Sequence, residues 1–135
     1  MTSDKKPSQL LNLSLWAAQL ILFIGFIWAA YMKLSHPGDK LAEMWPWTAG
    51  QGMLVKVTGI LDLLAGFGLV LPALLHIQPN ITIYTTYGII LLMITASIFH
   101  ITRGEASQIG INIFFLILSI FIVWGRTKKA PIAPK

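Results

Sequence analysis

The chain has 135 residues, of which 56 % are hydrophobic and 11 % are charged, with a formal net charge of +5 and no cysteine. An ordinary soluble domain carries about 25 % charged residues because its surface faces water, so we expect much of this surface to face lipid. The lack of cysteine excludes disulfides, thiolate metal sites and iron–sulfur clusters. The basic residues gather at the ends of apolar runs, which suits lipid headgroups and argues against a nucleic-acid partner.

The first apolar run, Leu10 to Met32, contains no Asp, Glu, Lys or Arg. A helix needs about 20 apolar residues to cross a bilayer, so this run predicts a first membrane span. The run is too long for the apolar region of a signal peptide, and no small-residue cleavage site closes it. We therefore expect a retained span after a short tail, residues 1–9.

The segment after this span, residues 34–52, is long and amphipathic. Residues 39–45 fit a short interfacial helix that ends before Pro46, with Trp45 and Trp47 at the headgroup boundary. A connector without regular structure fits the same residues. Both interpretations stay open from the sequence.

The uncharged stretch from Leu63 to Thr102 is too long for one crossing. It is interrupted at His76–Asn80, where Pro79 removes a backbone donor and Asn80 can cap a new helix. The chain as a whole predicts spans over about 10–32, 53–75, 81–101 and 108–125, with short tails at 1–9 and 126–135. The predicted fold is all-α: a single integral membrane domain that forms a four-transmembrane-helix bundle of up-and-down topology.

An even number of spans places both termini on one side of the membrane. That side carries Lys5, Lys6, Arg126, Lys128, Lys129 and Lys135, and the other carries Lys33, Lys40, Lys56 and Arg103. The positive-inside rule then predicts that both termini are cytoplasmic.

Asp62 is the polar residue that most needs an explanation, because it lies near the middle of the second span. A charge at the bilayer centre costs about 2.5–3.5 kcal/mol on insertion scales, so an intramembrane carboxylate is a functional candidate by default. A neutral Asp62 that hydrogen-bonds within a packed bundle is the alternative. Lys56 lies elsewhere around the same helix, so Asp62 needs a partner on another span. Lys33 is the candidate, although a lysine at a helix end can instead extend to the headgroups.

Further polar residues fall in the same outer half of the predicted membrane. His100 and Arg103 share a face of the third span, Glu105 follows in a tight loop, and Asn112 lies one turn inside the fourth span. An exposed ion pair between Arg103 and Glu105 is the plain alternative, worth at most about 1 kcal/mol. The candidate ligand-binding or proton-relay residues are Lys33, Lys56, Asp62, His100, Arg103, Glu105 and Asn112.

A cationic rim over a buried carboxylate, with a histidine within reach, suits a lipophilic ligand with a polar head. A quinone or quinol is such a ligand, and His100 and Asp62 are able to pass protons. Haem ligation is disfavoured because His76 and His100 are predicted at opposite membrane faces, and no spaced histidine motif indicates a metal site. No nucleophile with a paired base or phosphate loop is visible, so no catalytic residue is assigned.

Four short segments in order resemble the DoxX-like family of small membrane proteins. They are Met32–Leu34, Gly59–Pro72, Ile98–Glu105 and Trp124–Arg126. The resemblance extends over roughly residues 10–126, and Asp62 stands where the family tends to carry Glu, which keeps the carboxylate but shortens its side chain. By position, the resemblance implies functional residues at Lys33, Asp62, His100, Arg103 and Glu105.

The resemblance implies a four-helix protein of the bacterial inner membrane. Named relatives include small subunits of thiosulfate:quinone oxidoreductase and quinol-oxidase-associated proteins, and others assist redox proteins in the membrane. We therefore expect an accessory subunit of a membrane redox system rather than a stand-alone enzyme. Its expected partners are the bilayer, a quinone, and a membrane or periplasmic redox protein, with a homo-oligomer left open. The alternative is a non-catalytic scaffold or assembly chaperone that binds membrane proteins through its helix faces.

Overall fold

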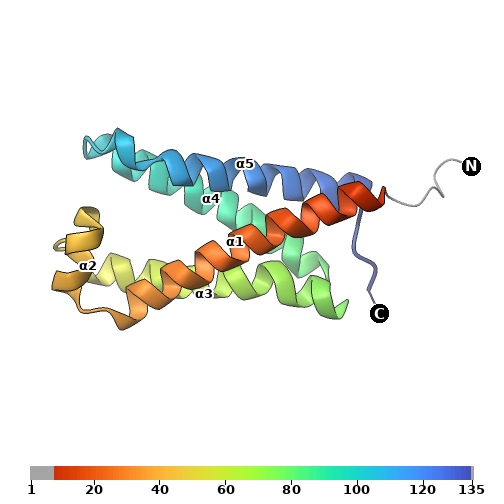
Figure 1. The fold of residues 1–135 in the computed structure, drawn as a ribbon, viewed down its shortest axis with the longest axis horizontal. Helices are drawn as coiled ribbons and strands as arrows, with labels where there is room; N and C mark the ends of the chain where they lie inside the picture. Colours follow the sequence, from red (N-terminus) through yellow and green to blue (C-terminus); the bar gives the residue numbers. More distant parts are fainter. Residues whose placement is uncertain (1–7, 135) are drawn as a thin grey trace, which may run out of the picture.

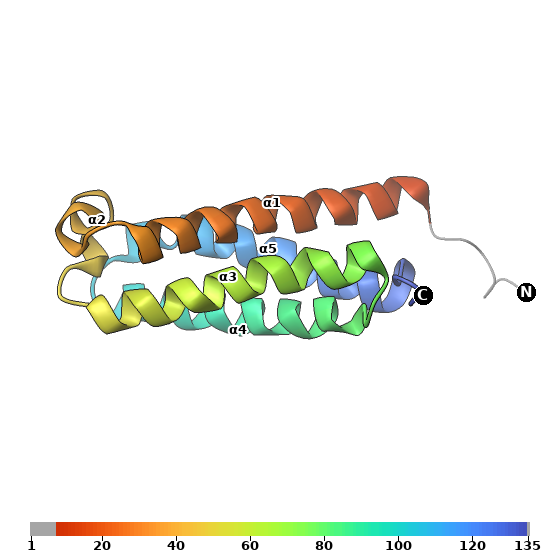
Figure 2. The same cartoon turned by 90° about the horizontal axis from the view of Figure 1, so that it is seen from below.

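The structure is a computed structural model that describes residues 8–134. In chain order its helices are α1 (Gln9–Ser35), α2 (Gly38–Met44), η2 (Pro46–Thr48), α3 (Gly52–Leu75), α4 (Asn80–Thr102), η3 (Ala106–Gln108), α5 (Gly110–Trp124) and the π-helical turn η4 (Gly125–Lys129). Four segments of the described chain are long and apolar enough to cross a membrane, namely α1, α3, α4 and α5 with η4. They run up and down along one axis (Figure 1, Figure 2), so the predicted four-helix bundle is confirmed.

The helix ends differ from the predicted spans by a few residues. α1 continues to Ser35, just before the helix-restricting Pro37. α2 provides the short helix that the sequence left as one of two alternatives for the first connection. Asn80 is the first residue of α4 rather than its cap, and the capping position is taken by Pro79, without a side-chain hydrogen bond.

The helices pack on their inner faces and leave their outer faces apolar. α1 packs most closely on α3, and α4 packs on both α3 and α5, whereas α1 and α5 touch much less. A side-chain carbon at Gly66 of α3 would lie 2.7 Å from Ile27 Cδ1 of α1, so glycine permits this close approach. Outward residues such as Leu91 and Ile117 are 67 % and 60 % exposed, as expected of side chains that face lipid.

At the end of the bundle that carries α2, the pair α1–α3 and the pair α4–α5 diverge (Figure 1). The connection formed by α2 and η2 lies between the two pairs. Its Trp45 packs edge-on against Trp28 of α1, with ring centroids 5.4 Å apart. Its Trp47 packs against Phe99 of α4, with ring centroids 6.0 Å apart. The connection therefore bridges the two pairs, and we call this end of the molecule the loop end.

The opposite end, which carries both termini, is held by a polar cluster around Arg126. The sequence placed Arg126 in a tail, but the helix continues through η4 and the side chain is only 1 % exposed. Its Nε donates to Gln19 Oε1 at 2.8 Å, and its Nη1 donates to Asn12 Oδ1 at 2.7 Å and to the carbonyl of Ala130 at 2.9 Å. Three of the predicted tail charges, Lys5, Lys6 and Lys135, lie outside the described residues.

The Arg126 cluster extends into α3 and α4 through a single carbonyl. Gln19 Nε2 donates to the carbonyl oxygen of Leu69 at 2.9 Å. Thr82 Oγ1 of α4 also lies 3.3 Å from this oxygen and 3.2 Å from the carbonyl oxygen of Gly68. Pro72 has no N–H to bond Gly68, so Thr82 supplies the missing donor. All four spans thus meet in one hydrogen-bonded group at the terminal end.

Candidate functional site

A buried ion pair joins α1 to α3 in the loop-end half of the bundle. Lys33 Nζ lies 2.8 Å from Asp62 Oδ2, and the two side chains are 12 % and 4 % exposed. Lys33 Nζ also donates to Thr58 Oγ1 at 3.2 Å, and it lies 5.5 Å from the centroid of the Trp47 ring, within cation–π range. Each charge therefore has a partner in a region where an isolated charge is costly.

A cavity of about 560 Å³ lies beside this pair, between the two diverging helix pairs. Its size falls within the range of about 300–1,000 Å³ that is usual for small-molecule sites. Its charged and hydrogen-bonding side chains include Lys33, Thr58, Asp62, Thr95, His100 and Asn112. Its aromatic side chains are Phe26, Trp28, Trp45, Trp47, Phe99 and Phe115. The cavity therefore combines a few polar groups with broad apolar walls.

Outward-facing residues of α1 and α5, the two neighbouring helices that touch least, border the cavity. Trp28 of α1 and Ile111 of α5 both line the cavity, and they are also 51 % and 56 % exposed on the outside of the bundle. Toward the terminal end, Phe115 packs onto Gly25 so closely that a side-chain carbon there would lie 2.5 Å from the ring. The wall of the cavity that holds the Lys33–Asp62 pair therefore continues to the outside of the bundle at Trp28 and Ile111.

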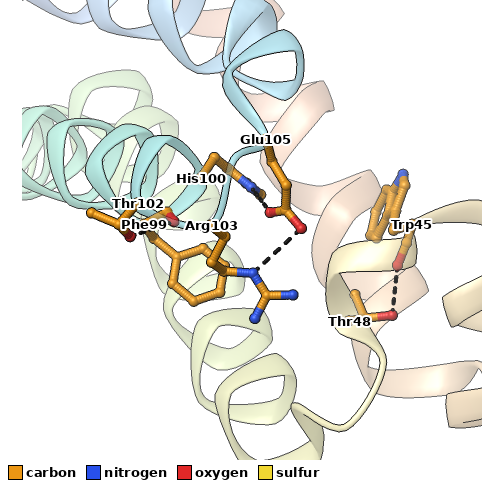
Figure 3. Close-up of polar contacts among 7 residues, drawn as sticks. All are labelled: Trp45, Thr48, Phe99, His100, Thr102, Arg103 and Glu105. Atoms are coloured by element: carbon orange, nitrogen blue, oxygen red, sulfur yellow. Dashed lines mark hydrogen bonds and ion pairs between the residues drawn. The ribbon is translucent and has the colours of Figure 1, made fainter.

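Next to the cavity, Glu105 holds two side chains from the end of α4 (Figure 3). Its Oε1 lies 2.9 Å from His100 Nδ1, and its Oε2 lies 3.3 Å from Arg103 Nε. His100 is buried and lines the cavity, and its ring packs edge-on against Trp47 with centroids 5.8 Å apart. Arg103 turns away and lies over the Phe99 ring at 4.9 Å. Glu105 therefore orients the histidine from outside the cavity.

The structure brings four of the seven sequence-predicted residues to one cavity: Lys33, Asp62, His100 and Asn112. The other three, Lys56, Arg103 and Glu105, do not line it. The exposed Lys56 reaches only the carbonyl oxygen of Lys33, at 3.4 Å, while Arg103 and Glu105 form the outer support of His100. Of the two alternatives for Lys33, the structure supports the pair with Asp62.

Sequence reasoning missed several residues of the site. Thr58 lies one helical turn before Asp62, so the spacing of four residues offered a signal for it. Trp47 was predicted only as an interfacial anchor, and its contacts with Lys33 and His100 depend on how the connection folds back. A second hollow of about 460 Å³ between α3 and α4 is lined by apolar residues, glycine and threonine, and holds none of the predicted site residues.

We expect the contribution of Glu105 to the stability of the loop end to depend on pH. The hydrogen bond with His100, helped by the charge of Arg103, holds the pKa of Glu105 below its ordinary value of 4.5. A lowered folded-state pKa means that this stabilisation is fully present above about pH 4.5 and is lost as the pH falls through the lowered value. We expect Glu105→Gln to remove this part of the acid sensitivity. The measurement is the free energy of unfolding in detergent as a function of pH, and an unchanged acid limb in the variant would contradict the assignment.

Comparison with known proteins gives one match. The model of the DoxX-like family matches residues 17–122, which include α1 from its third turn, the whole cavity and most of α5. No curated protein and no solved structure matches the chain significantly.

Proposed function

The chain belongs to the DoxX-like family and is a multi-pass membrane protein, and on this premise we propose that it is an accessory subunit of a membrane redox system that binds a quinone-like lipophile. The observation that carries the proposal is the cavity beside Lys33 and Asp62, which is bordered by outward-facing residues of α1 and α5. A quinone head group has a flat ring with two oxygens, which suits aromatic walls and a few polar groups. Its apolar tail would pass between α1 and α5, beside the exposed Trp28 and Ile111.

The residues on the cavity support binding more directly than catalysis. Lys33, Asp62 and His100 offer hydrogen bonds to a ligand oxygen, and His100 is positioned by Glu105. We further propose that both termini are cytoplasmic, because basic residues gather at the terminal end of the bundle. The cavity then lies in the outer half of a bacterial inner membrane. A membrane or periplasmic redox protein would then meet the ligand at the loop end.

Filling the cavity tests the proposal without removing a polar group. Ala96 lines the cavity on α4, so Ala96→Phe is expected to occupy ligand space and weaken binding by about tenfold or more, since lost apolar contacts of this size cost at least about 1.4 kcal/mol. The control is Leu91→Phe, which adds a ring on the lipid-exposed face of the same helix. Mass spectrometry of lipids retained by the gently solubilised protein, followed by binding of a decyl-benzoquinone, measures the effect.

Three outcomes separate the proposal from a scaffold role. Retention of a quinone or quinol by the wild type and by Leu91→Phe, with loss in Ala96→Phe, supports it. Equal retention by all three places the ligand outside the cavity and contradicts it. A wild type that retains none and binds none leaves the polar cluster as architecture and overturns the proposal.

A further inference from the structure

The hydrogen-bond donors in the deep wall of the cavity are largely committed to protein partners. The Lys33 ammonium has three N–H donors, and two of them serve Asp62 Oδ2 and Thr58 Oγ1. The hydroxyl proton of Thr58 points back to its own helix, where the carbonyl oxygen of Leu54 lies 2.8 Å away. One N–H of Lys33 is left to meet a ligand.

Two acceptors on the same cavity have no partner within the described part of the chain. Asp62 uses Oδ2 for Lys33 and leaves Oδ1 without a hydrogen bond. His100 uses Nδ1 for Glu105 and leaves Nε2 without one. Among the described residues, the single fully enclosed side-chain polar atom that lacks a partner is Nη2 of Arg126. Oδ1 and Nε2 therefore reach open space, and the open space that both residues line is the cavity.

The contact with Glu105 determines whether His100 Nε2 is a hydrogen-bond donor or an acceptor toward the cavity. An ionised carboxylate only accepts hydrogen bonds, so the proton of a neutral His100 ring is assigned to Nδ1, facing Glu105. Nε2 then carries the lone pair and acts as an acceptor. The cavity thus shows two unpaired acceptors, Asp62 Oδ1 and His100 Nε2, next to the remaining ammonium N–H of Lys33. The indole N–H groups of Trp28, Trp45 and Trp47 are further donors on its wall. The side-chain amide of Asn112 can act as a hydrogen-bond donor or as an acceptor.

We propose that the cavity selects a hydroxyl-bearing aromatic head, the quinol, over the carbonyl-bearing quinone. This inference rests on the proposed function. A hydroxyl oxygen accepts from Lys33 while its proton goes to Asp62 Oδ1 or His100 Nε2. A carbonyl oxygen only accepts, so it leaves both acceptors without a donor from the ligand. An unpaired buried acceptor costs about 1–3 kcal/mol, which corresponds to a preference of about tenfold or more for the quinol.

The test compares three matched probes on the full-length protein in detergent at mildly alkaline pH. They are a decyl-benzoquinone, the hydroquinone made from it by anaerobic reduction, and the dimethyl ether of that hydroquinone. Equilibrium dialysis should give a Kd for the hydroquinone about tenfold or more below the Kd of the other two. A redox titration checks this independently, because each tenfold preference raises the midpoint potential of the bound two-electron couple by about 30 mV.

The outcomes distinguish this inference from the function on which it rests. Quinone binding as tight as hydroquinone binding, or a dimethyl ether that binds as well as the hydroquinone, overturns the selectivity and leaves quinone binding intact. Binding of none of the probes overturns both. His100→Phe, which keeps a ring against Trp47, should lower the preference several-fold, whereas Lys56→Gln, outside the cavity, should keep it. A full preference in His100→Phe would contradict the role of His100 as acceptor.

Discussion

Replacing Asp62 by asparagine is expected to lower the free energy of unfolding by about 3–5 kcal/mol, the usual loss when one partner of a buried ion pair is removed. The substitution hardly changes the volume, so the loss comes from Lys33. Its ammonium would remain in a side chain that is only 12 % exposed, with Thr58 as its remaining side-chain partner and the Trp47 ring alongside. Unfolding in mixed detergent micelles, followed by tryptophan fluorescence, measures the change.

The double variant Lys33→Met/Asp62→Leu is the matched control. A buried ion pair that is replaced by apolar residues of similar volume is often neutral or stabilising, because neither charge has to leave water. We therefore expect the double variant to recover most of the stability that Asp62→Asn loses. If the double variant unfolds with a lower free energy than Asp62→Asn, the ion pair must stabilise the bundle beyond the mutual neutralisation of its two charges.

The second large effect is expected at the opposite end of the molecule. Arg126→Met should lower the free energy of unfolding by about 2–4 kcal/mol. Hydrogen bonds to charged groups contribute about 1.5–3 kcal/mol each, and the desolvation cost of burying the guanidinium offsets part of this stabilisation. The variant leaves Gln19 Oε1 and Asn12 Oδ1 without their donor. The same unfolding measurement applies.

Two comparisons test whether this loss comes from the hydrogen bonds of Arg126. Lys128→Met removes an exposed charge two residues away and should leave the stability within about 0.5 kcal/mol of the wild type. Gln19→Leu added to Arg126→Met should cost less than the sum of the two single changes, because the residues contact each other. Full additivity, or an equal loss in Lys128→Met, would contradict the account of the Arg126 cluster.

The spans and the candidate pairing of Lys33 with Asp62 could be predicted because both follow from one-dimensional spacing. Runs of apolar residues give the crossings, and the depth of Asp62 along its helix demands a partner on another span. The contact of Glu105 with Arg103 is also close in sequence and was considered as an ion pair, whereas the contact of Glu105 with His100 was not predicted.

The cavity could not be predicted, because it arises from the divergence of two helix pairs and from a connection that folds back between them. Nothing in the local sequence shows that Trp47 reaches His100 on α4 or that Arg103 turns outward. Arg126 was misplaced for a related reason: a basic residue after an apolar run is typical of a solvated tail, and only the approach of α1 brings Asn12 and Gln19 to its guanidinium.

Binding of the decyl-hydroquinone to the double variant Lys33→Met/Asp62→Leu tests most directly whether the cavity is a ligand site whose polar groups recognise the head group. This variant is expected to keep the fold while it lacks the Lys33 donor and the Asp62 acceptor on the cavity. We expect a folded protein whose Kd for the hydroquinone is raised by about tenfold or more. A folded double variant that binds the hydroquinone as tightly as the wild type would contradict it.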